Sequence, residues 1–443
     1  MGAIPGPPGH SLLGVVPAFE RDMLGALEES FAAYGDCVAY RFGPAWPGRL
    51  GFTAVAAYHP DDVGRALNDS AVFGRDTVGF TVIRESIGDG LLTLTGETWR
   101  RHRRIVQQLF TARRVAGYGA LMAAEADRTV ADTAVHGDVV DLHDLMQRYT
   151  LRVVGRALFG DDIDGVVGEL QELVGLLGET STARRLQLFR LPLSLPTPRN
   201  RTLRDVRRRL FAIADAVLDG CGRDTDPAAG NLLTRLRGAR DEQTGARLSD
   251  QEVRDEVLGF LLAGHETTAG ALTFTLHELG RRPDIQDRIA AAGEDADALV
   301  RASVMEGMRL YPPAHTTERV TLVDTEIAGH PVPAGTQILV SPWVTHRHPE
   351  FWPDPHRFDP SRFVGTHDRP RCAYLPFGGG VRACVGMRFA VQEATVVLKA
   401  LLTRFRVDTT GHELTLTPLL TLRPAGPVPA RMTARVPARA VAR

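Results

Sequence analysis

The segment around Cys384 has the composition of a loop that stabilises a thiolate. Residues 377–386 read FGGGVRACVG, and a helix is predicted to follow from Met387 to about Leu402. The glycines permit left-handed turns and let the backbone come close to a flat ligand. Backbone amides, the N-terminus of that helix and the guanidinium of Arg382 would stabilise negative charge on the sulfur. Such a thiolate can serve as an axial ligand to haem iron, and the alternative is a buried structural cysteine in a glycine-rich turn.

A second candidate for chemistry is an acid beside an alcohol in the middle of a predicted apolar helix. Residues 263–268 read AGHETT, and the two small residues at the start would let a planar ligand approach the helix. The carboxylate of Glu266 is costly there unless it is used or well bonded. The hydroxyl of Thr267 can bond to a carbonyl one turn earlier, which opens the helix locally and leaves room for water. The alternative is an ordinary helix with a threonine pair; His265 is expected to be a pocket or groove residue.

Two further pairs of residues lie one helical turn apart. Glu306 and Arg309 form an E-x-x-R pair with apolar flanks. On a surface such a pair would contribute roughly a few tenths of a kcal/mol. Trp99 and Arg103 share one face of another predicted helix. The neighbouring basic residues are expected to form a solvated helix face: Arg100, Arg101 and Arg104.

The element best defined by the sequence is the helix that carries the acid–alcohol pair. It is predicted from Asp250 to about Arg281, because Ser249 and Glu252 form a capping box and Pro283 stops it. At about 1.5 Å per residue it can cross a whole domain, and its apolar middle should be buried.

The rest of the chain is predicted to be mainly helical with a small β-sheet region. Helical periodicity dominates from Thr98 to Leu279. A meander rich in proline and aromatic residues, 346–363, precedes the cysteine segment. Strands are expected at Val38–Phe42, Leu50–Ala56, Val320–Ile327 and Thr336–Val340 and within Glu413–Arg435.

The composition argues against several classes of protein. The 443 residues carry a formal net charge of −1, so no global field would steer the chain to nucleic acid or to an anionic membrane. Its four cysteines form no C-x-x-C motif, which fits a reducing compartment and argues against a disulfide framework. A signal peptide and an apolar run of about 18–20 residues are both missing from the sequence. We therefore expect a cytoplasmic protein with no membrane anchor.

Four motifs, in their order along the chain, resemble those of the cytochrome P450 family. They are the helical pattern W-x-x-x-R, the helix segment A-G-x-[DE]-T-[TS], the pair E-x-x-R and the cysteine loop F-x-x-G-x-R-x-C-x-G. The resemblance covers essentially the whole chain and is most specific at the cysteine loop, where every defined position matches. It implies a fold that is mainly α with a small β-sheet region, with haem between the long central helix and the cysteine-loop helix. Residues 1–443 would form a single domain with no fused reductase, and residues 1–12 and 436–443 would be extended or flexible.

The resemblance also implies roles for particular residues. Cys384 would be the axial ligand to the iron of haem b, Thr267 would contact dioxygen, and Glu266 would help to relay protons from solvent. Arg362 would join Glu306 and Arg309 in a buried network that holds the meander beneath the cysteine loop. The residues expected to bind the cofactor are Trp99, Arg103, Ala263, Gly264, Arg319, Phe377, Gly378, Arg382 and Gly386.

By the same resemblance the chain would be a monooxygenase that inserts one oxygen atom from O2 into an apolar small molecule. A terpenoid, a polyketide or a macrocycle of secondary metabolism would suit the pocket positions, which are mostly aliphatic. These positions are Phe80, Ile83, Leu92, Leu188, Leu262, Ala263, Ala314, Thr316 and Leu420.

The expected protein is a monomer that receives electrons from a separate ferredoxin and its reductase. An acidic donor would dock on the thiolate side, on a patch formed by Arg100, Arg101, Arg104, Arg113, Arg114 and Arg388. Two other classes stay open. A peroxide-driven or non-oxygenase haem-thiolate enzyme often lacks the acid–alcohol pair, which is intact here. A non-catalytic haem carrier or sensor would need neither the pocket nor the relay.

Overall fold

The computed structural model describes residues 4–44, 51–135, 139–160, 164–185, 187, 191–220, 231–365 and 368–435. Leu188 and the C-terminal residues 436–443, for which the sequence carried expectations, lie outside these ranges. Residues 5–14 run beside the first strand, where the Ala39 N–H donates to the Pro5 carbonyl over 2.8 Å. No helix among the described residues combines the length and the apolarity that a membrane span requires.

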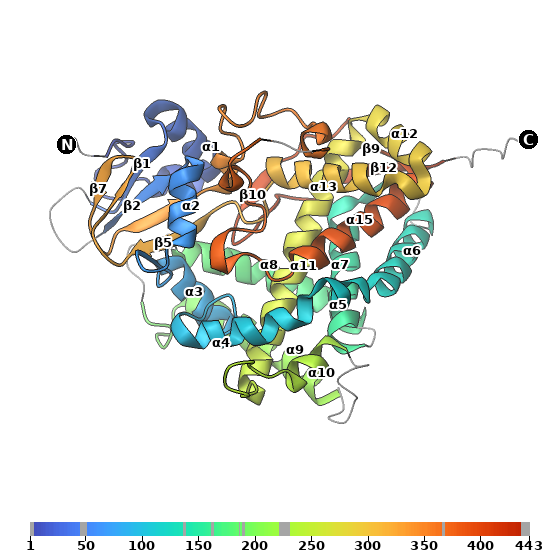
Figure 1. Cartoon of the computed structure of the whole chain (residues 1–443), viewed down its shortest axis with the longest axis horizontal. Coiled ribbons are helices and arrows are strands. Elements are labelled where there is room, and N and C mark those ends of the chain that lie inside the picture. The colour runs from blue at the N-terminus through green and yellow to red at the C-terminus, as the bar shows by residue number, and fades with distance from the viewer. Residues whose placement is uncertain are drawn as a thin grey trace, which may run out of the picture.

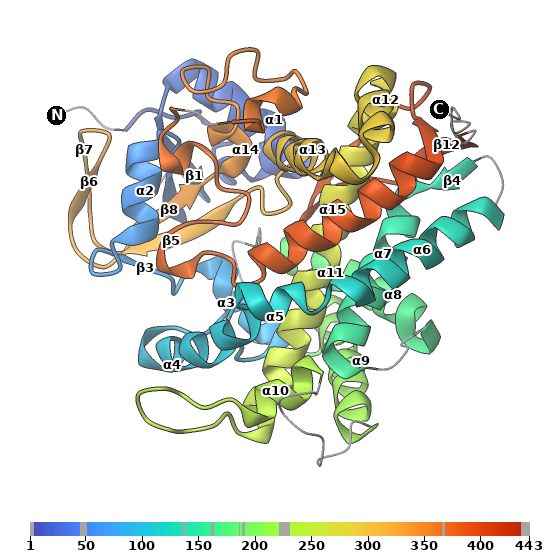
Figure 2. The same cartoon turned by 45° about the vertical axis from the view of Figure 1, so that its right-hand side comes forward.

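The structure is mainly helical, with most of the helices on one side and β1, β2 and β5, together with α1 and α2, on the other (Figure 1). α11 runs through the middle of the helical part, and α15 lies across it in both views (Figure 2). The helices are α1 (Val16–Tyr34), α2 (Pro60–Asn68), α3 (Val78–Ile87), α4 (Gly96–Gln107), α5 (Ala112–Ala116), α6 (Gly119–Val135), α7 (Leu142–Phe159), α8 (Asp164–Arg185), α9 (Pro198–Gly220), α10 (Leu232–Gly238), α11 (Asp250–Gly280), α12 (Pro283–Ala292), α13 (Asp297–Leu310), α14 (Pro342–Thr345) and α15 (Met387–Arg404).

The largest sheet has five strands in the order β1-β2-β8-β5-β3, and the others have two or three. β2 and β8 are parallel, while β1–β2, β5–β8 and β3–β5 are antiparallel. The strands are β1 (Cys37–Phe42), β2 (Phe52–Ala57), β3 (Phe73–Gly74), β4 (Val139–Asp141), β5 (Thr317–Thr321), β6 (Thr325–Ile327), β7 (His330–Val332), β8 (Gln337–Val340), β9 (Phe405–Asp408), β10 (Leu416–Pro418), β11 (Leu422–Pro424) and β12 (Pro429–Ala434).

The predicted central helix is confirmed as α11. Its capping box is complete: the Glu252 N–H donates to the Ser249 hydroxyl over 3.3 Å, and the Ser249 N–H donates to the Glu252 carboxylate over 2.8 Å. Small residues bring other helices close to it. A Cβ at Gly307 of α13 would lie 2.1 Å from the Thr275 hydroxyl, so this crossing requires glycine.

One apolar core joins the helices that support the cysteine loop. Met122 of α6, Met146 of α7, Leu272 of α11, Val304 of α13 and Leu398 of α15 all belong to it and are buried. Burial of such side chains is the main favourable term in folding, so this core determines how α11 and α15 cross.

The expected strand Val320–Ile327 is wrong as a single element. The structure divides it into β5 and β6, because the chain turns at residues 322–324. There the Asp324 carboxylate accepts the Ala334 N–H over 2.8 Å, and the Leu322 N–H donates to the Val72 carbonyl over 2.7 Å. A side chain that bonds to the backbone in this way competes with the strand ladder.

Candidate active site

The cysteine loop is a tight turn that presents Cys384 just before α15. The Cys384 N–H donates to the Phe377 carbonyl over 2.9 Å, which closes the loop. Gly378 and Gly380 have φ values of 66° and 68°, in the left-handed region. A Cβ at Gly380 would lie 2.3 Å from the Leu67 carbonyl oxygen, so this position needs glycine for both conformation and space.

Cys384 is accessible at the surface of the cysteine loop, but the protein atoms around its sulfur leave little room for water to solvate a negative charge. Burial nevertheless raises the pKa of the Cys384 thiol, although the Gly386 N–H and the charge of Arg103 act in the opposite direction. The loop alone therefore leaves the sulfur protonated. A metal cation bound to the sulfur would displace that proton, because a coordinating thiol is deprotonated outright.

α11 exposes a short strip of its middle, although its flanking residues are buried. Leu261 and His265 are buried, but Ala263 between them is exposed and Thr267 is half-buried. The Thr267 hydroxyl donates to the Ala263 carbonyl over 2.5 Å, the back-bond expected from the sequence. The strip of Ala263, Gly264 and Thr267 is therefore accessible to a ligand, although α11 runs through the middle of the helical part.

The Glu266 carboxylate points to a partner that the sequence did not indicate. It forms an ion pair with the Arg423 guanidinium of β11, and both side chains are largely buried. The carboxylate is thus held by charge pairing at the edge of the helix strip. His265 differs from expectation: it is fully buried, and its backbone carbonyl accepts the Thr150 hydroxyl of α7 over 3.2 Å. Burial lowers the pKa of His265 to about 3, so its ring is neutral.

Four arginines gather beside the cysteine loop: Arg75, Arg103, Arg319 and Arg382. Arg103 donates to the Ala383 carbonyl over 2.9 Å and Arg382 to the Leu94 carbonyl over 2.8 Å. Arg382 also stacks over the Trp99 ring, with its guanidinium carbon 3.8 Å from the ring centroid. These contacts bring Trp99 and Arg103 of α4 onto the loop that holds Cys384. Carbonyl oxygens and an aromatic ring do not neutralise these cations, and Asp76 is the carboxylate that acts on Arg382.

Strand register explains why two of these cations are neighbours. In the antiparallel β3–β5 pair, Phe73 faces Thr321 and Gly74 faces Val320. Arg75 is the residue after Gly74, and the charge of Arg319 acts on it. Like charges so close repel, and an anion bound between them would relieve the repulsion.

The charges of this cluster are poorly solvated. Burial lowers the pKa of Arg319 and of Arg382 to about 10, and it lowers that of Arg75 well below the usual range. The Nε atom of Arg75 is buried with no hydrogen-bond partner among the described residues. The cluster therefore fits a ligand with two carboxylates that is buried at this edge.

The chain belongs to the cytochrome P450 family. The family model for cytochrome P450 matches residues 4–427. Cyclooctat-9-en-7-ol 5-monooxygenase of Streptomyces melanosporofaciens is 35% identical over 412 residues, which is 89% of this chain and 87% of that protein. Cyclooctatin synthase of the same organism is 34% identical, with 85% and 84% of the two chains covered. Pentalenene oxygenase of Streptomyces avermitilis is 33% identical, with 85% of each chain covered.

The observed residues fit the haem-thiolate cofactor that this family implies. The cysteine loop offers one accessible sulfur, α11 offers a strip without large side chains, and the arginine cluster offers cations for two propionates. Arg75 is the residue of this set that sequence reasoning missed.

We predict that Arg75→Ala and Arg103→Ala will each weaken cofactor retention roughly tenfold or more, because each leaves a buried carboxylate without its cation. The ratio of haem to protein after gel filtration measures this. Arg113→Ala is the control, because Arg113 is exposed. Haem content equal to that of the control in both variants would remove these arginines from the site.

The structure also brings Glu306, Arg309 and Arg362 together beneath the cysteine loop. Arg309 makes two bonds to the Glu306 carboxylate, of 2.7 and 2.8 Å, and Arg362 lies 3.5 Å from it. Arg309 also donates to the carbonyls of His346, Pro355 and Arg357, so it satisfies the backbone of the meander. The His346 ring in turn accepts the Leu375 N–H over 2.7 Å, which ties the meander to the start of the loop.

Several expected pocket residues share one apolar cluster. Phe80 and Ile83 of α3 belong to it, and Leu262 of α11 and Leu420, between β10 and β11, pack against it. Leu92 is 37% exposed and is not among its members; the neighbouring Leu91 packs there instead. Ala314 is exposed and Thr316 is half-buried. Leu188 lies outside the described residues.

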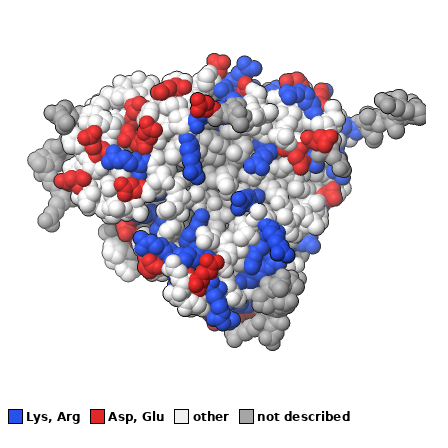
Figure 3. Space-filling view, in the orientation of Figure 1, with Lys and Arg blue, Asp and Glu red and all other residues white. Residues whose placement is uncertain are grey.

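The expectation of a solvated basic face on α4 is wrong for two of its arginines. Arg104 pairs with the buried Asp241 over 2.6 Å, and Arg101 pairs with Glu252 of α11. Arg100 is exposed but lies 3.1 Å from Glu97. Figure 3 shows basic and acidic side chains intermixed around α4. Of the six arginines expected to form a basic patch, Arg113, Arg114 and Arg388 are exposed and form no ion pair with an acid among the described residues.

Proposed function

We propose that this P450 monooxygenase inserts one oxygen atom from O2 into a terpenoid, with haem b as its cofactor. The observation that carries the proposal is the Thr267 hydroxyl on the exposed strip of α11, in a chain that retains the acid–alcohol pair. The relatives support the substrate class, because they are named as a cyclooctat-9-en-7-ol 5-monooxygenase, a cyclooctatin synthase and a pentalenene oxygenase. The aliphatic cluster at the expected pocket supports it as well, since it offers few polar partners.

When bound, the haem would supply the redox chemistry that activates dioxygen. The protein's part is to hold the substrate in a dry pocket and to move protons. Thr267 can turn its hydroxyl from the Ala263 carbonyl toward a water beside the exposed strip of α11. Glu266 can accept and return protons at its carboxylate once it moves away from Arg423. Arg423 therefore acts as the partner that must release the acid during turnover.

A peroxide-driven enzyme is the second candidate. It would need no proton relay, so the intact Glu266–Thr267 pair argues against it. A carrier or sensor would need neither this pair nor an apolar pocket.

A substrate screen tests the proposal directly. Purified holoenzyme is titrated with cyclic terpene hydrocarbons and terpene alcohols, and the Soret band is followed for the shift that accompanies loss of water from the iron. Compounds that bind are then incubated with a ferredoxin, its reductase, NADPH and ¹⁸O2. We expect one ¹⁸O atom in the product. Product formed only with hydrogen peroxide, without ¹⁸O from O2, would favour the second candidate. No binding by any terpenoid, with binding by polyketides, would overturn the substrate class.

We also propose that electrons arrive from a separate ferredoxin at the basic patch of Arg113, Arg114 and Arg388. Exposed charge pairs are screened by salt, with a Debye length of about 10 Å at about 0.1 M. The double variant Arg113→Glu, Arg114→Glu should therefore lower ferredoxin-dependent reduction and flatten its salt dependence. Arg208→Glu on α9, also exposed, is the control. Reduction rates that stay equal in both variants at every salt concentration would exclude this face.

A further inference from the structure

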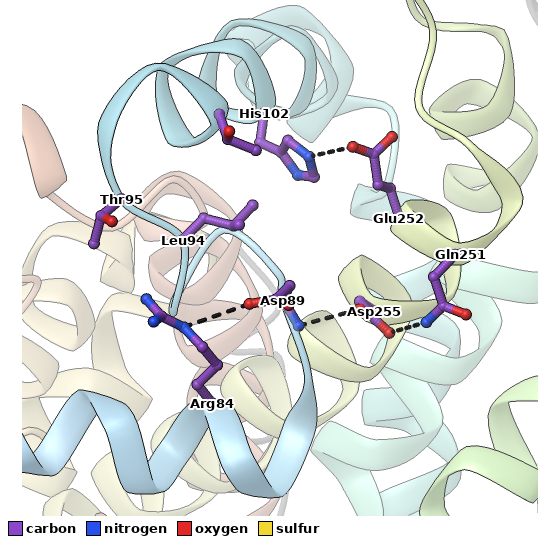
Figure 4. Close-up of a pocket in the computed structure, with 9 residues that line it drawn as sticks. Arg84, Asp89, Leu94, Thr95, His102, Gln251, Glu252 and Asp255 are labelled. Carbon is purple, nitrogen blue, oxygen red and sulfur yellow. Dashed lines mark hydrogen bonds and ion pairs between the residues drawn. The ribbon is translucent and has the colours of Figure 1, made fainter. Parts of the chain in front are cut away.

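A histidine of α4 is held between two carboxylates of α11. The side chain of His102 is fully buried, and its Nδ1 lies 2.6 Å from the Glu256 carboxylate, which is 1% exposed. Its Nε2 lies 3.2 Å from the Glu252 carboxylate. Figure 4 shows the ring pointing from α4 toward Glu252. Each ring nitrogen has a carboxylate oxygen as its nearest polar partner, and Nε2 also lies 3.4 Å from the Arg101 guanidinium, which pairs with the same Glu252 carboxylate. Two carboxylate acceptors suit the doubly protonated imidazolium.

The surroundings of His102 contain more acid than base. A cavity of about 470 Å³ borders the ring, with Asp89, Glu252 and Asp255 among the residues that line it (Figure 4). Arg84 lies 3.4 Å from Asp89, and Arg101 pairs with Glu252. Asp255 accepts the Asp89 N–H over 3.1 Å and the Gln251 amide over 2.9 Å. The buried Glu256 has His102 as its close cation.

The charge state follows from these contacts. Burial is the largest single influence and lowers the pKa of His102, but the bonds and charges of Glu256 and Glu252 together raise it above its usual value. A carboxylate as deeply buried as that of Glu256 is stable only with a cation beside it. These contacts therefore favour the charged form of His102.

The same helix carries cofactor-binding residues on either side of this contact. Arg103 follows His102 directly and bonds to the Ala383 carbonyl of the cysteine loop. Trp99, one turn earlier, lies under Arg382. The position of α4 relative to α11 therefore decides where the cation of Arg103 and the Trp99 ring, which supports Arg382, lie. Glu252 strengthens the link, because its other oxygen completes the capping box of α11.

We propose that His102 is a positioning residue for the cofactor: its doubly bonded imidazolium clasps α4 to α11 and so holds Arg103 and Trp99 at the propionate edge. The proposal is independent of the substrate and of the oxygenation chemistry. The polar contacts of the His102 ring are with Arg101, Glu252 and Glu256.

The clasp has a defined dependence on pH. A histidine whose pKa is raised in the folded state stabilises that state fully below its ordinary pKa of about 6.5. The stabilisation is lost as the pH rises through the raised value, because the neutral ring can donate to one carboxylate and not to both. The holoenzyme should therefore hold its cofactor less tightly at alkaline pH.

Cofactor transfer to excess apomyoglobin tests the clasp with the holoenzyme. The rates of wild type and His102→Gln are compared between about pH 6 and about pH 9, where a histidine of raised pKa titrates. At the acidic end the variant should lose haem roughly ten- to hundredfold faster, the range expected for bonds to charged groups. The ratio of the two rates should fall toward one as the pH rises, because glutamine resembles the neutral ring.

Two further variants complete the test. Glu256→Gln should show the same loss and the same convergence, and it serves if His102→Gln does not fold. His356→Gln, at an exposed histidine, should match wild type at every pH. A ratio near one at about pH 6 would overturn the proposal. A ratio above one that does not change with pH would also overturn it, since it would mean that packing and not the charged ring holds α4.

Discussion

Cys384→Ser should abolish the red-shifted band that the reduced, carbon monoxide-bound protein shows in its difference spectrum. The band would require a thiolate bound to the haem iron, and a serine hydroxyl at residue 384 would be a far weaker donor of electron density to iron. The loop itself should survive the change, because its closing bond runs between the Cys384 N–H and the Phe377 carbonyl. We expect complete loss of the band in a protein that still folds.

Cys372 provides the matched control for this variant. Cys372→Ser changes another free thiol, which lies against Gly64 and away from the α11 strip. This variant should keep the whole band. Circular dichroism of both variants separates loss of the ligand from loss of the fold. If Cys384→Ser retains the band, the sulfur of Cys384 is not the ligand and the cysteine loop has another role.

The sequence predicts best what local signals determine. The bounds of α11 follow from Ser249, Glu252 and Pro283, which act within one turn of the helix ends. The back-bond from Thr267 to Ala263 is likewise a contact within one turn. The E-x-x-R pair is of the same kind, although its burial and its third member depend on the meander that packs over it.

Contacts that depend on the tertiary fold could not be predicted from local pattern. Arg75 follows a strand of two residues, too short to show a period, and it comes near Arg319 because β3 pairs with β5. Arg423 meets Glu266 because β11 is placed against α11. A sequence motif therefore indicated Glu266 and Thr267, while no motif indicated Arg423, the partner of Glu266.

Runs of charged residues were the least reliable basis for predicting which side chains are exposed. A row of arginines on α4 suggests a solvated face, yet Arg101 and Arg104 each reach an acid from another part of the chain. His102 lies in the same run and is fully buried. Its only signal in the sequence is a helical position between Trp99 and Ile105, both of which are also buried. A run of basic residues on a helix can thus lie in the interior of the protein when acidic residues of a neighbouring helix pair with it.

Thr267→Ala should separate consumption of reducing equivalents from formation of product. The hydroxyl is the polar group on the exposed strip of α11, and its present bond to the Ala263 carbonyl is one it can exchange for a water. Without it, protons would reach the reaction site from unordered water. Because positioned proton transfer typically contributes about 10²–10⁴ in rate, product per NADPH should fall by roughly tenfold or more, and hydrogen peroxide should account for the difference.

Conservative variants identify which property of the residue matters. Thr267→Ser keeps the hydroxyl and should restore most of the coupling between NADPH and product. Thr268→Ala removes a hydroxyl that is buried away from the strip and should leave the coupling unchanged. The measurement is NADPH oxidation, hydrogen peroxide and oxygenated terpenoid in the same reaction. Undiminished product per NADPH in Thr267→Ala would end the relay role of this residue. If added hydrogen peroxide alone also supported this undiminished turnover, the result would point to the peroxide-driven enzyme. Such an enzyme needs no protons delivered along α11.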